Sequence, residues 1–127
     1  MSRLILVALY AGGALHVAFA AFHLLFWKIF RWREELAKLV PLNRQVVQVL
    51  NLALTVAFAG AAYVSIRFAP DLATMPLGRG VCFAVAVFWL ARLAMQFMFF
   101  DMRKPASWAL SLACVVLVVI YGVPVFV

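Results

Sequence analysis

Charged residues are scarce in this chain of 127 residues, where they make up only 12% of the sequence. A soluble domain usually contains about 25% charged and about 45–50% apolar residues, whereas 69% of this chain is hydrophobic. A soluble protein this small would lack the polar residues needed to cover its surface. The composition therefore excludes an ordinary soluble domain and indicates that lipid surrounds much of the chain.

Acidic residues are rarer still, because the chain has four of them and none lies inside a long apolar run. A hydrolytic triad needs a carboxylate to orient its imidazole, and no nucleophile motif is present. A proton-coupled transporter usually needs an acid inside the membrane. We therefore expect a protein without enzymatic activity.

Histidine and cysteine each occur only twice. His16 and His23 share one helix face but lie about 10.5 Å apart along its axis, so they cannot flank a single haem iron. A zinc site needs three or four ligands. We expect no cofactor and no metal, since haem b would need ligands shared across subunits or with a methionine. Cys82 and Cys114 lack CxxC spacing and are expected to be small apolar residues that face either lipid or the core.

Four long apolar runs are present, at about residues 4–27, 46–68, 81–100 and 106–127. Each has about 20 residues or more, which suits a helix that crosses a hydrocarbon core about 30 Å thick. The sequence predicts an all-α fold, with residues 1–127 forming a single transmembrane domain. We expect an integral membrane bundle of four transmembrane helices.

Lysine and arginine are distributed unequally among the connections between these runs. The first and third connections together carry seven lysines and arginines. The side that holds the termini and the second connection carries three, which are Arg3, Arg67 and Arg79. The positive-inside rule then places both termini on the non-cytoplasmic side of a multi-pass protein in the inner (plasma) membrane. The basic balance reflects this topology and an anionic leaflet, and no nucleic-acid-binding module accompanies it. The seven basic residues of the first and third connections are Lys28, Arg31, Arg33, Lys38, Arg44, Arg103 and Lys104.

The first connection, 28–45, mixes basic and aromatic residues. Its apolar residues Ile29, Trp32, Leu36 and Leu39 follow helical spacing. This pattern favours a helix lying at the membrane interface, with its basic side chains toward lipid phosphates, or a continuation of the first helix into the cytoplasm.

Polar residues inside the apolar runs gather at similar predicted depths. Three runs each place hydrogen-bonding groups in the cytoplasmic half of the bilayer, where polar side chains usually face protein or water. Their spacing gives one stripe per helix, so we expect a polar pocket among the first three spans, closed by Ser107 and Ser111 of the fourth. The predicted ligand-binding residues are His16, His23, Arg44, Gln48, Asn51, Arg92 and Gln96.

Arg92 is the charged member of this set, and two interpretations of it remain open. It can bond Asn51, Gln96 and main-chain carbonyls, or it can hold an anionic head group. The two histidines can similarly satisfy polar groups or pass protons between waters. The leading hypothesis is a pocket for an amphipathic or anionic ligand, such as lipid or quinone. The alternatives are an accessory subunit of a larger membrane complex, and an oligomeric channel or transporter.

Three segments, "HVAFAAFHLLFWKIFRW", "LNRQVVQVLN" and "FWLARLAMQFMFF", give the chain a resemblance to small four-helix bacterial membrane families of unknown function. The resemblance extends over nearly the whole chain in layout. It implies the four-helix fold and an inner-membrane location, and it implies no activity and no site residues. Membrane lipids are the expected partners, and a homo-oligomer or a larger membrane complex remains open.

Overall fold

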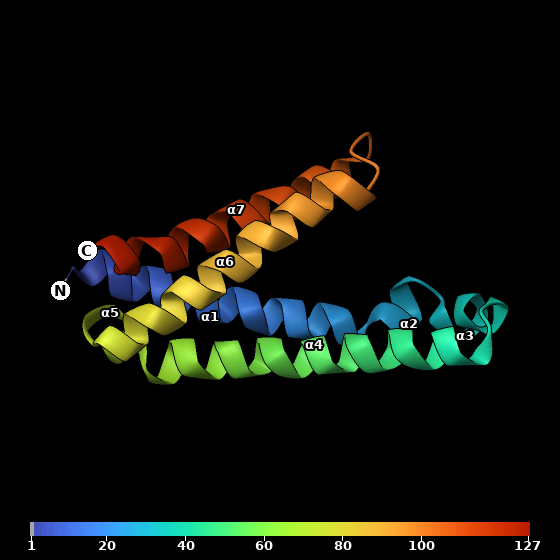
Figure 1. Ribbon diagram of the computed structural model, residues 1–127, viewed down its shortest axis with the longest axis horizontal. Coiled ribbons are helices and arrows are strands. Elements are labelled where there is room, and N and C mark those ends of the chain that lie inside the picture. Colours follow the sequence, from blue (N-terminus) through green and yellow to red (C-terminus); the bar gives the residue numbers. More distant parts are fainter. Residues whose placement is uncertain (1) are drawn as a thin grey trace. The chain divides into compact units, whose positions relative to one another are not determined.

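The computed structural model describes residues 2–127 and is all-α in that range (Figure 1). Four of its helices are long enough and apolar enough to cross a membrane. Such helices are typical of a multi-pass membrane protein. They are α1 (Arg3–Leu24), α4 (Pro41–Arg67), α6 (Pro76–Phe99) and α7 (Pro105–Phe126). The shorter elements are α2 (Phe26–Ile29), α3 (Trp32–Glu35), the 3-10 helix η1 (Leu36–Lys38) and α5 (Ala69–Thr74).

Prolines begin three of the long helices, which explains where the predicted boundaries were inaccurate. Pro41, Pro76 and Pro105 are the first residues of α4, α6 and α7. Proline suits the first helical turn because its missing N–H would have no helical partner there. α4 and α6 thus start five residues before the apolar runs predicted from 46 and 81. These added residues include polar ones, which hydropathy alone does not assign to an apolar run.

The segment predicted as one helix over 29–39 is helical only in short pieces. Arg31 has φ 54° and ψ 44°, a left-handed conformation, and it separates α2 from α3. Because an L-residue rarely continues a helix through this conformation, neither a continuous interfacial helix nor an uninterrupted extension of α1 forms. The connection over 69–80, between the second and third apolar runs, contains the helix α5 and the first turn of α6.

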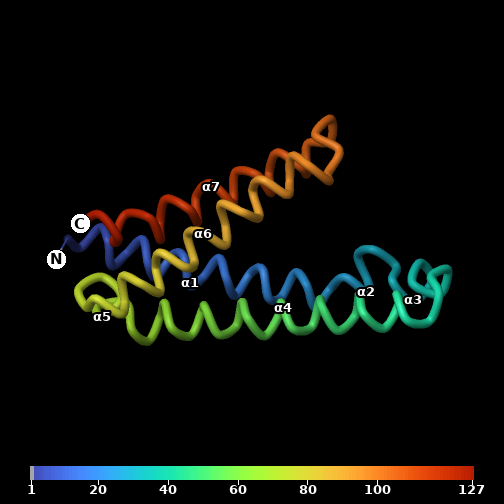
Figure 2. The backbone as a smooth tube through the Cα atoms, in the orientation of Figure 1, coloured from blue at the N-terminus to red at the C-terminus, as the bar shows by residue number. Residues whose placement is uncertain are grey.

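The chain forms two compact units, which are described separately. The hairpin unit contains the residues up to Gly12 together with Phe68–Val127. In it, α6 and α7 run antiparallel and side by side, as Figure 2 shows. Its largest buried side chains are Trp89, Tyr121, Leu9 and Leu117, and the free thiols Cys82 and Cys114 are buried, so they face the core and not lipid.

Glycines of the hairpin unit allow two close contacts. A Cβ on Gly78 would lie 2.1 Å from the carbonyl oxygen of Asp71, so α6 passes α5 at main-chain distance. A Cβ on Gly12 would lie 2.9 Å from the Tyr121 ring. Small residues permit this kind of close approach between helices in membranes.

The α4 unit comprises Gly13–Arg67, and in it the second half of α1 packs along α4. A Cβ on Gly13 would lie 2.6 Å from Cγ1 of Ile66, so this glycine allows α1 and α4 to approach each other closely. Gly60 has open space around its Cα.

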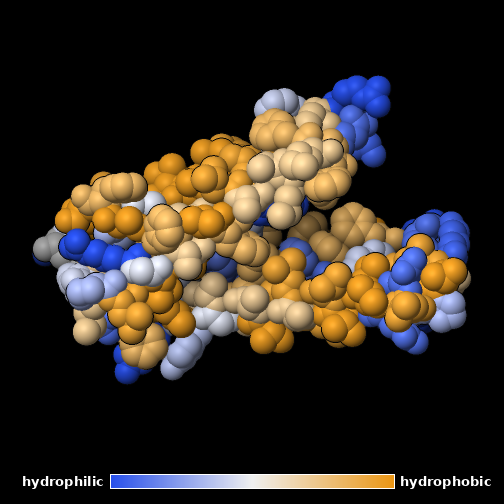
Figure 3. All heavy atoms as spheres, viewed as in Figure 1, coloured by the Kyte–Doolittle hydropathy of each residue, from blue (hydrophilic) through white to orange (hydrophobic). Residues whose placement is uncertain are grey.

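Large apolar side chains lie on the outer faces of the long helices (Figure 3). Examples are Val56 on α4, Leu90 on α6 and Leu112 on α7, with 71%, 56% and 65% of their surface exposed. Hydrophilic residues gather at the turn between α6 and α7 and around α3. Soluble monomers rarely expose apolar patches this extensive, whereas lipid-facing helices require them.

Candidate ligand-binding site

The two histidines lie on the face of α1 that packs against α4. The ring of His16 lies 6.0 Å from that of Phe58, and the ring of His23 lies 5.1 Å from it. His16 is buried and His23 is half-buried. The Nδ1 atom of His23 is 2.7 Å from the carbonyl oxygen of Phe19. Since a carbonyl can only accept, Nδ1 carries the proton in this contact, and in the neutral ring Nε2 is then the acceptor.

Asn51 connects α4 to the C-terminal end of α1. Its Nδ2 donates to the carbonyl oxygen of His23 at 3.0 Å. The last carbonyls of a helix have no partner within the helix, so this bond satisfies one of them. The other side-chain atom, Oδ1, is buried and accepts no hydrogen bond from any described residue. The site therefore contains a buried acceptor that can take a donor.

The predicted polar stripe on α4 is present and is partly bonded to its own helix. Gln48 donates through Nε2 to the carbonyl oxygen of Arg44 at 3.2 Å, and Thr55 donates to that of Asn51 at 2.9 Å. Asn51 and Thr55 are buried, whereas Arg44 and Gln48 are half-buried. The stripe thus becomes more exposed toward the start of α4.

A pocket of about 290 Å³ lies at this more exposed end, and we call it the basic–aromatic pocket. Four elements, α2, α3, η1 and α4, contribute to its wall. The indole rings of Trp27 and Trp32 meet edge to face with 5.1 Å between their centroids. The seven lining residues are Trp27, Trp32, Arg33, Leu36, Ala37, Arg44 and Gln48.

The charges around this pocket leave its two arginines without acidic partners. The two glutamates of the segment pair elsewhere, Glu34 with Arg31 and Glu35 with Lys38. Within the described residues, no ion pair involves Arg33 or Arg44. Arginine stays protonated and offers a planar set of donors that matches carboxylate and phosphate oxygens. The pocket can therefore accept an anion.

Arg92 and Gln96 belong to the hairpin unit, where they bond each other. Arg92 donates through Nη1 to Oε1 of Gln96 at 2.9 Å, and its guanidinium lies 5.2 Å from the centroid of the Phe100 ring. Gln96 donates in turn to the carbonyl oxygen of Ser107 on α7 at 3.3 Å. The hydroxyl of Ser107 donates to the carbonyl oxygen of Asp101. These bonds tie α6 to α7 next to their connecting turn.

Asp101 lies in that turn, outside the long helices. Arg103 donates to its carboxylate through both the side chain and the main chain. These hydrogen bonds hold the pKa of the Asp101 carboxyl below its ordinary value. The residue therefore keeps its negative charge in a strongly basic turn.

The seven predicted site residues thus form two groups. His16, His23 and the α4 residues lie in the α4 unit, and Arg92 with Gln96 lies in the hairpin unit. Arg44 and Gln48 line the basic–aromatic pocket, and Asn51 bonds the main chain of His23. The single polar pocket shared by three helices stays a prediction from the sequence.

Sequence reasoning missed Trp27, Trp32 and Arg33 as residues of a binding site. Their signal was visible as alternating basic and aromatic residues, but it was interpreted as an interfacial helix. The left-handed Arg31 turns the chain so that these residues surround a pocket instead. Arg79 was considered only for topology, although it also lines a pocket.

Among the described residues, no group of three histidine, cysteine or acidic side chains is placed to hold a metal ion. The absence of a cofactor stays a prediction from the sequence. Comparison with family models, curated proteins and solved structures finds no match to this chain. What can be stated is the class: an all-α chain with four helices suited to crossing a membrane.

Proposed function

We propose that this chain is a multi-pass membrane protein that binds an anionic amphipath, such as a phospholipid, at the basic–aromatic pocket. The observation that carries the proposal is the pairing of two arginines, which form no ion pair with any described residue, with two indole rings around one cavity. This deepens the expectation of an amphipathic or anionic ligand, because it names the residues that would recognise each part.

The pocket residues match the chemistry of a lipid at the membrane surface. Arg33 and Arg44 supply donors for a phosphate oxygen, which arginine can bind in bidentate fashion. Tryptophan favours the interface between hydrocarbon and water, and Leu36 supplies an apolar wall. A neutral quinone would leave both arginine charges uncompensated, so the charge favours an anionic lipid.

The distribution of basic residues supports the same assignment. The positive-inside rule places the 28–45 connection and the α6–α7 turn in the cytoplasm, with both termini opposite. Anionic lipids are concentrated in the cytoplasmic leaflet, where each nearby lysine or arginine contributes about 1 kcal/mol of attraction. The proposed ligand is therefore abundant where the pocket would lie.

Native mass spectrometry with added phosphatidylglycerol tests this proposal. We expect Arg33→Gln and Arg44→Gln each to weaken binding of one phosphatidylglycerol about tenfold, corresponding to about 1.4 kcal/mol. Lys28→Gln is the matched control, since it removes one positive charge from the same segment but does not line the pocket. Phosphatidylcholine carries no net charge, so its binding should be the same in the parent protein and in both arginine variants.

Equal losses in all three variants would show that the segment attracts lipid only through its net charge, and the pocket assignment would be rejected. Retention of a protein partner in place of lipid would instead support the alternative of an accessory subunit. Defined higher oligomers that conduct ions in vesicles would support the channel alternative.

A further inference from the structure

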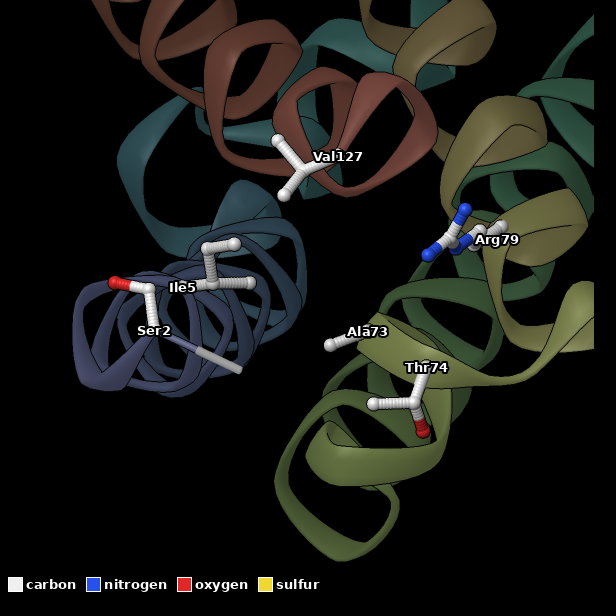
Figure 4. Close-up of a pocket in the computed structure, with 6 residues that line it drawn as sticks. All are labelled: Ser2, Ile5, Ala73, Thr74, Arg79 and Val127. Atoms are coloured by element: carbon white, nitrogen blue, oxygen red, sulfur yellow. The ribbon is translucent and has the colours of Figure 1, made fainter.

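A second pocket, of about 280 Å³, lies within the hairpin unit at the N-terminal end of α6 (Figure 4). The first residues of the described chain, α5, α6 and the C-terminal residue surround it. Figure 4 shows the guanidinium of Arg79 extending from α6 toward the middle of this space. We call it the Arg79 pocket, and its lining residues are Ser2, Ile5, Ala73, Thr74, Arg79 and Val127.

Arg79 lacks an acceptor that its burial would normally require. Its Nε atom is buried and has no hydrogen-bond partner among the described residues. Within those residues, Arg79 also forms no ion pair. A buried donor without an acceptor costs about 1–3 kcal/mol, and more when it belongs to a charged group. An oxyanion that accepts from the guanidinium would remove this cost.

The other polar groups of the pocket are compatible with such an anion. The Ser2 hydroxyl accepts from the main-chain N–H of Leu4 at 3.2 Å, which leaves its own proton available to donate. The Thr74 hydroxyl donates to the carbonyl oxygen of Pro70 at 2.8 Å. No aspartate or glutamate lines the pocket. Arg79 is the lining residue with a charged side chain, and that charge is positive.

An apolar groove of about 190 Å³ lies next to this pocket. Ile5 lines both cavities, so the two are adjacent. The groove lies between the first half of α1 and the second half of α7, and all of its side chains are aliphatic. Its lining residues are Leu4, Ile5, Ala8, Val119, Ile120 and Val123. A cationic pocket next to an apolar groove suits a molecule with a charged head and a hydrocarbon chain.

We propose that the Arg79 pocket and the adjoining groove form a second binding site, which takes an amphipath with a phosphate-ester head. Arg79 binds the head through Nε and a terminal nitrogen together, after a rotation of its side chain that brings Nε to the pocket. The hydrocarbon chain lies along Ala8 and Val119. This site shares no residue with the basic–aromatic pocket, so either proposal can fail without the other.

The test uses the full chain in phosphatidylcholine nanodiscs, with dodecyl phosphate and inorganic phosphate as the two probes. The Nε–Hε resonance of Arg79, assigned by its loss in Arg79→Gln, reports on the head-group contact. We expect a saturable shift of this resonance with dodecyl phosphate. Inorganic phosphate at the same concentration should leave it unchanged, since it gains nothing from the groove.

Two further variants separate the head from the chain. Ala8→Phe fills the groove and should weaken dodecyl phosphate binding at least tenfold while the Arg79 resonance remains. Val119→Phe fills the groove from α7 and tests the groove independently if the first variant does not fold. Arg3→Gln is the charge control, because Arg3 is exposed and does not line the pocket. It should leave the affinity unchanged.

The alternative outcomes each overturn a defined part of the proposal. Equal affinity for both probes would identify a free-phosphate site and refute the amphipath. Unchanged affinity for dodecyl phosphate in both groove variants would also refute the amphipath. No shift of the Arg79 resonance with either probe would refute the site altogether.

Discussion

Asn51 shows how a single polar residue is used within an otherwise apolar helix. Its side chain both caps the end of α1, through the carbonyl oxygen of His23, and leaves a buried acceptor open. The first contact is structural, whereas the second resembles an incomplete binding site. Replacing Asn51 by alanine therefore measures how much its hydrogen bond to the His23 carbonyl contributes to stability.

We predict that Asn51→Ala lowers the free energy of unfolding by about 1 kcal/mol, since one interhelical hydrogen bond in a membrane protein contributes about that much or less. Thermal or detergent-induced unfolding of the purified protein would measure it. Val49→Ala is the control, because Val49 lies on the same helix with 63% of its surface exposed. An equal loss in the control would contradict a specific role for the Asn51 bond.

The sequence predicted some of these residue-level features and not others. Spacing alone placed His16 and His23 on one helix face and Arg44, Gln48 and Asn51 on another. It could not show that Asn51 bonds a main-chain carbonyl, because that depends on where α1 ends. It also could not show that Arg33 joins Arg44 around one pocket, because that depends on a left-handed residue between two short helices.

At the scale of elements, apolar length predicted the four long helices well, and local chemistry decided their ends. Hydropathy cannot register that Pro41 or Pro76 suits a first helical turn. The short helix α5 was hidden because its proline and glycine neighbours are typical of a turn. Gly78 is the residue that allows α5 and α6 to follow each other so closely.

We predict that Gly78→Ala and Gly80→Ala have opposite effects on stability. The new methyl group at 78 would collide with the main chain of α5, where overpacking costs about 1–3 kcal/mol. At 80 nothing lies within 4 Å, so alanine should stabilise α6 by about 0.5–1 kcal/mol through its higher helix propensity. The difference between the two unfolding free energies is the measurement. Similar values for the two variants would mean that α5 does not approach α6 as described.

At the scale of the whole molecule, composition and basic-residue distribution together predict how the chain would cross a membrane. If all four helices of suitable length cross the membrane, both ends of the chain would lie on the same side. The basic residues then determine which side that is. This orientation also decides which leaflet each proposed binding site would face.

We predict that a membrane-impermeant maleimide labels Thr74→Cys in intact cells and labels Lys104→Cys only after the membrane is permeabilised. Both positions are exposed, Thr74 at the end of α5 and Lys104 in the α6–α7 turn. The native Cys82 and Cys114 are buried and should react slowly, which the parent protein would verify. The reverse labelling pattern would invert the proposed topology and move the basic–aromatic pocket to the other leaflet.

The short α6–α7 turn has a consequence for biosynthesis. An arginine raises the insertion free energy of a helix by about 2.5–3.5 kcal/mol at the helix centre and by less toward its ends, and Arg92 lies between the centre and the C-terminal end of α6. α7 has no charged residue and follows after a turn of only a few residues, and Gln96 bonds its main chain. We therefore expect the ribosome to deliver α6 and α7 to the insertion machinery as one helical hairpin. The strongly apolar second helix then offsets the cost of the arginine in the first.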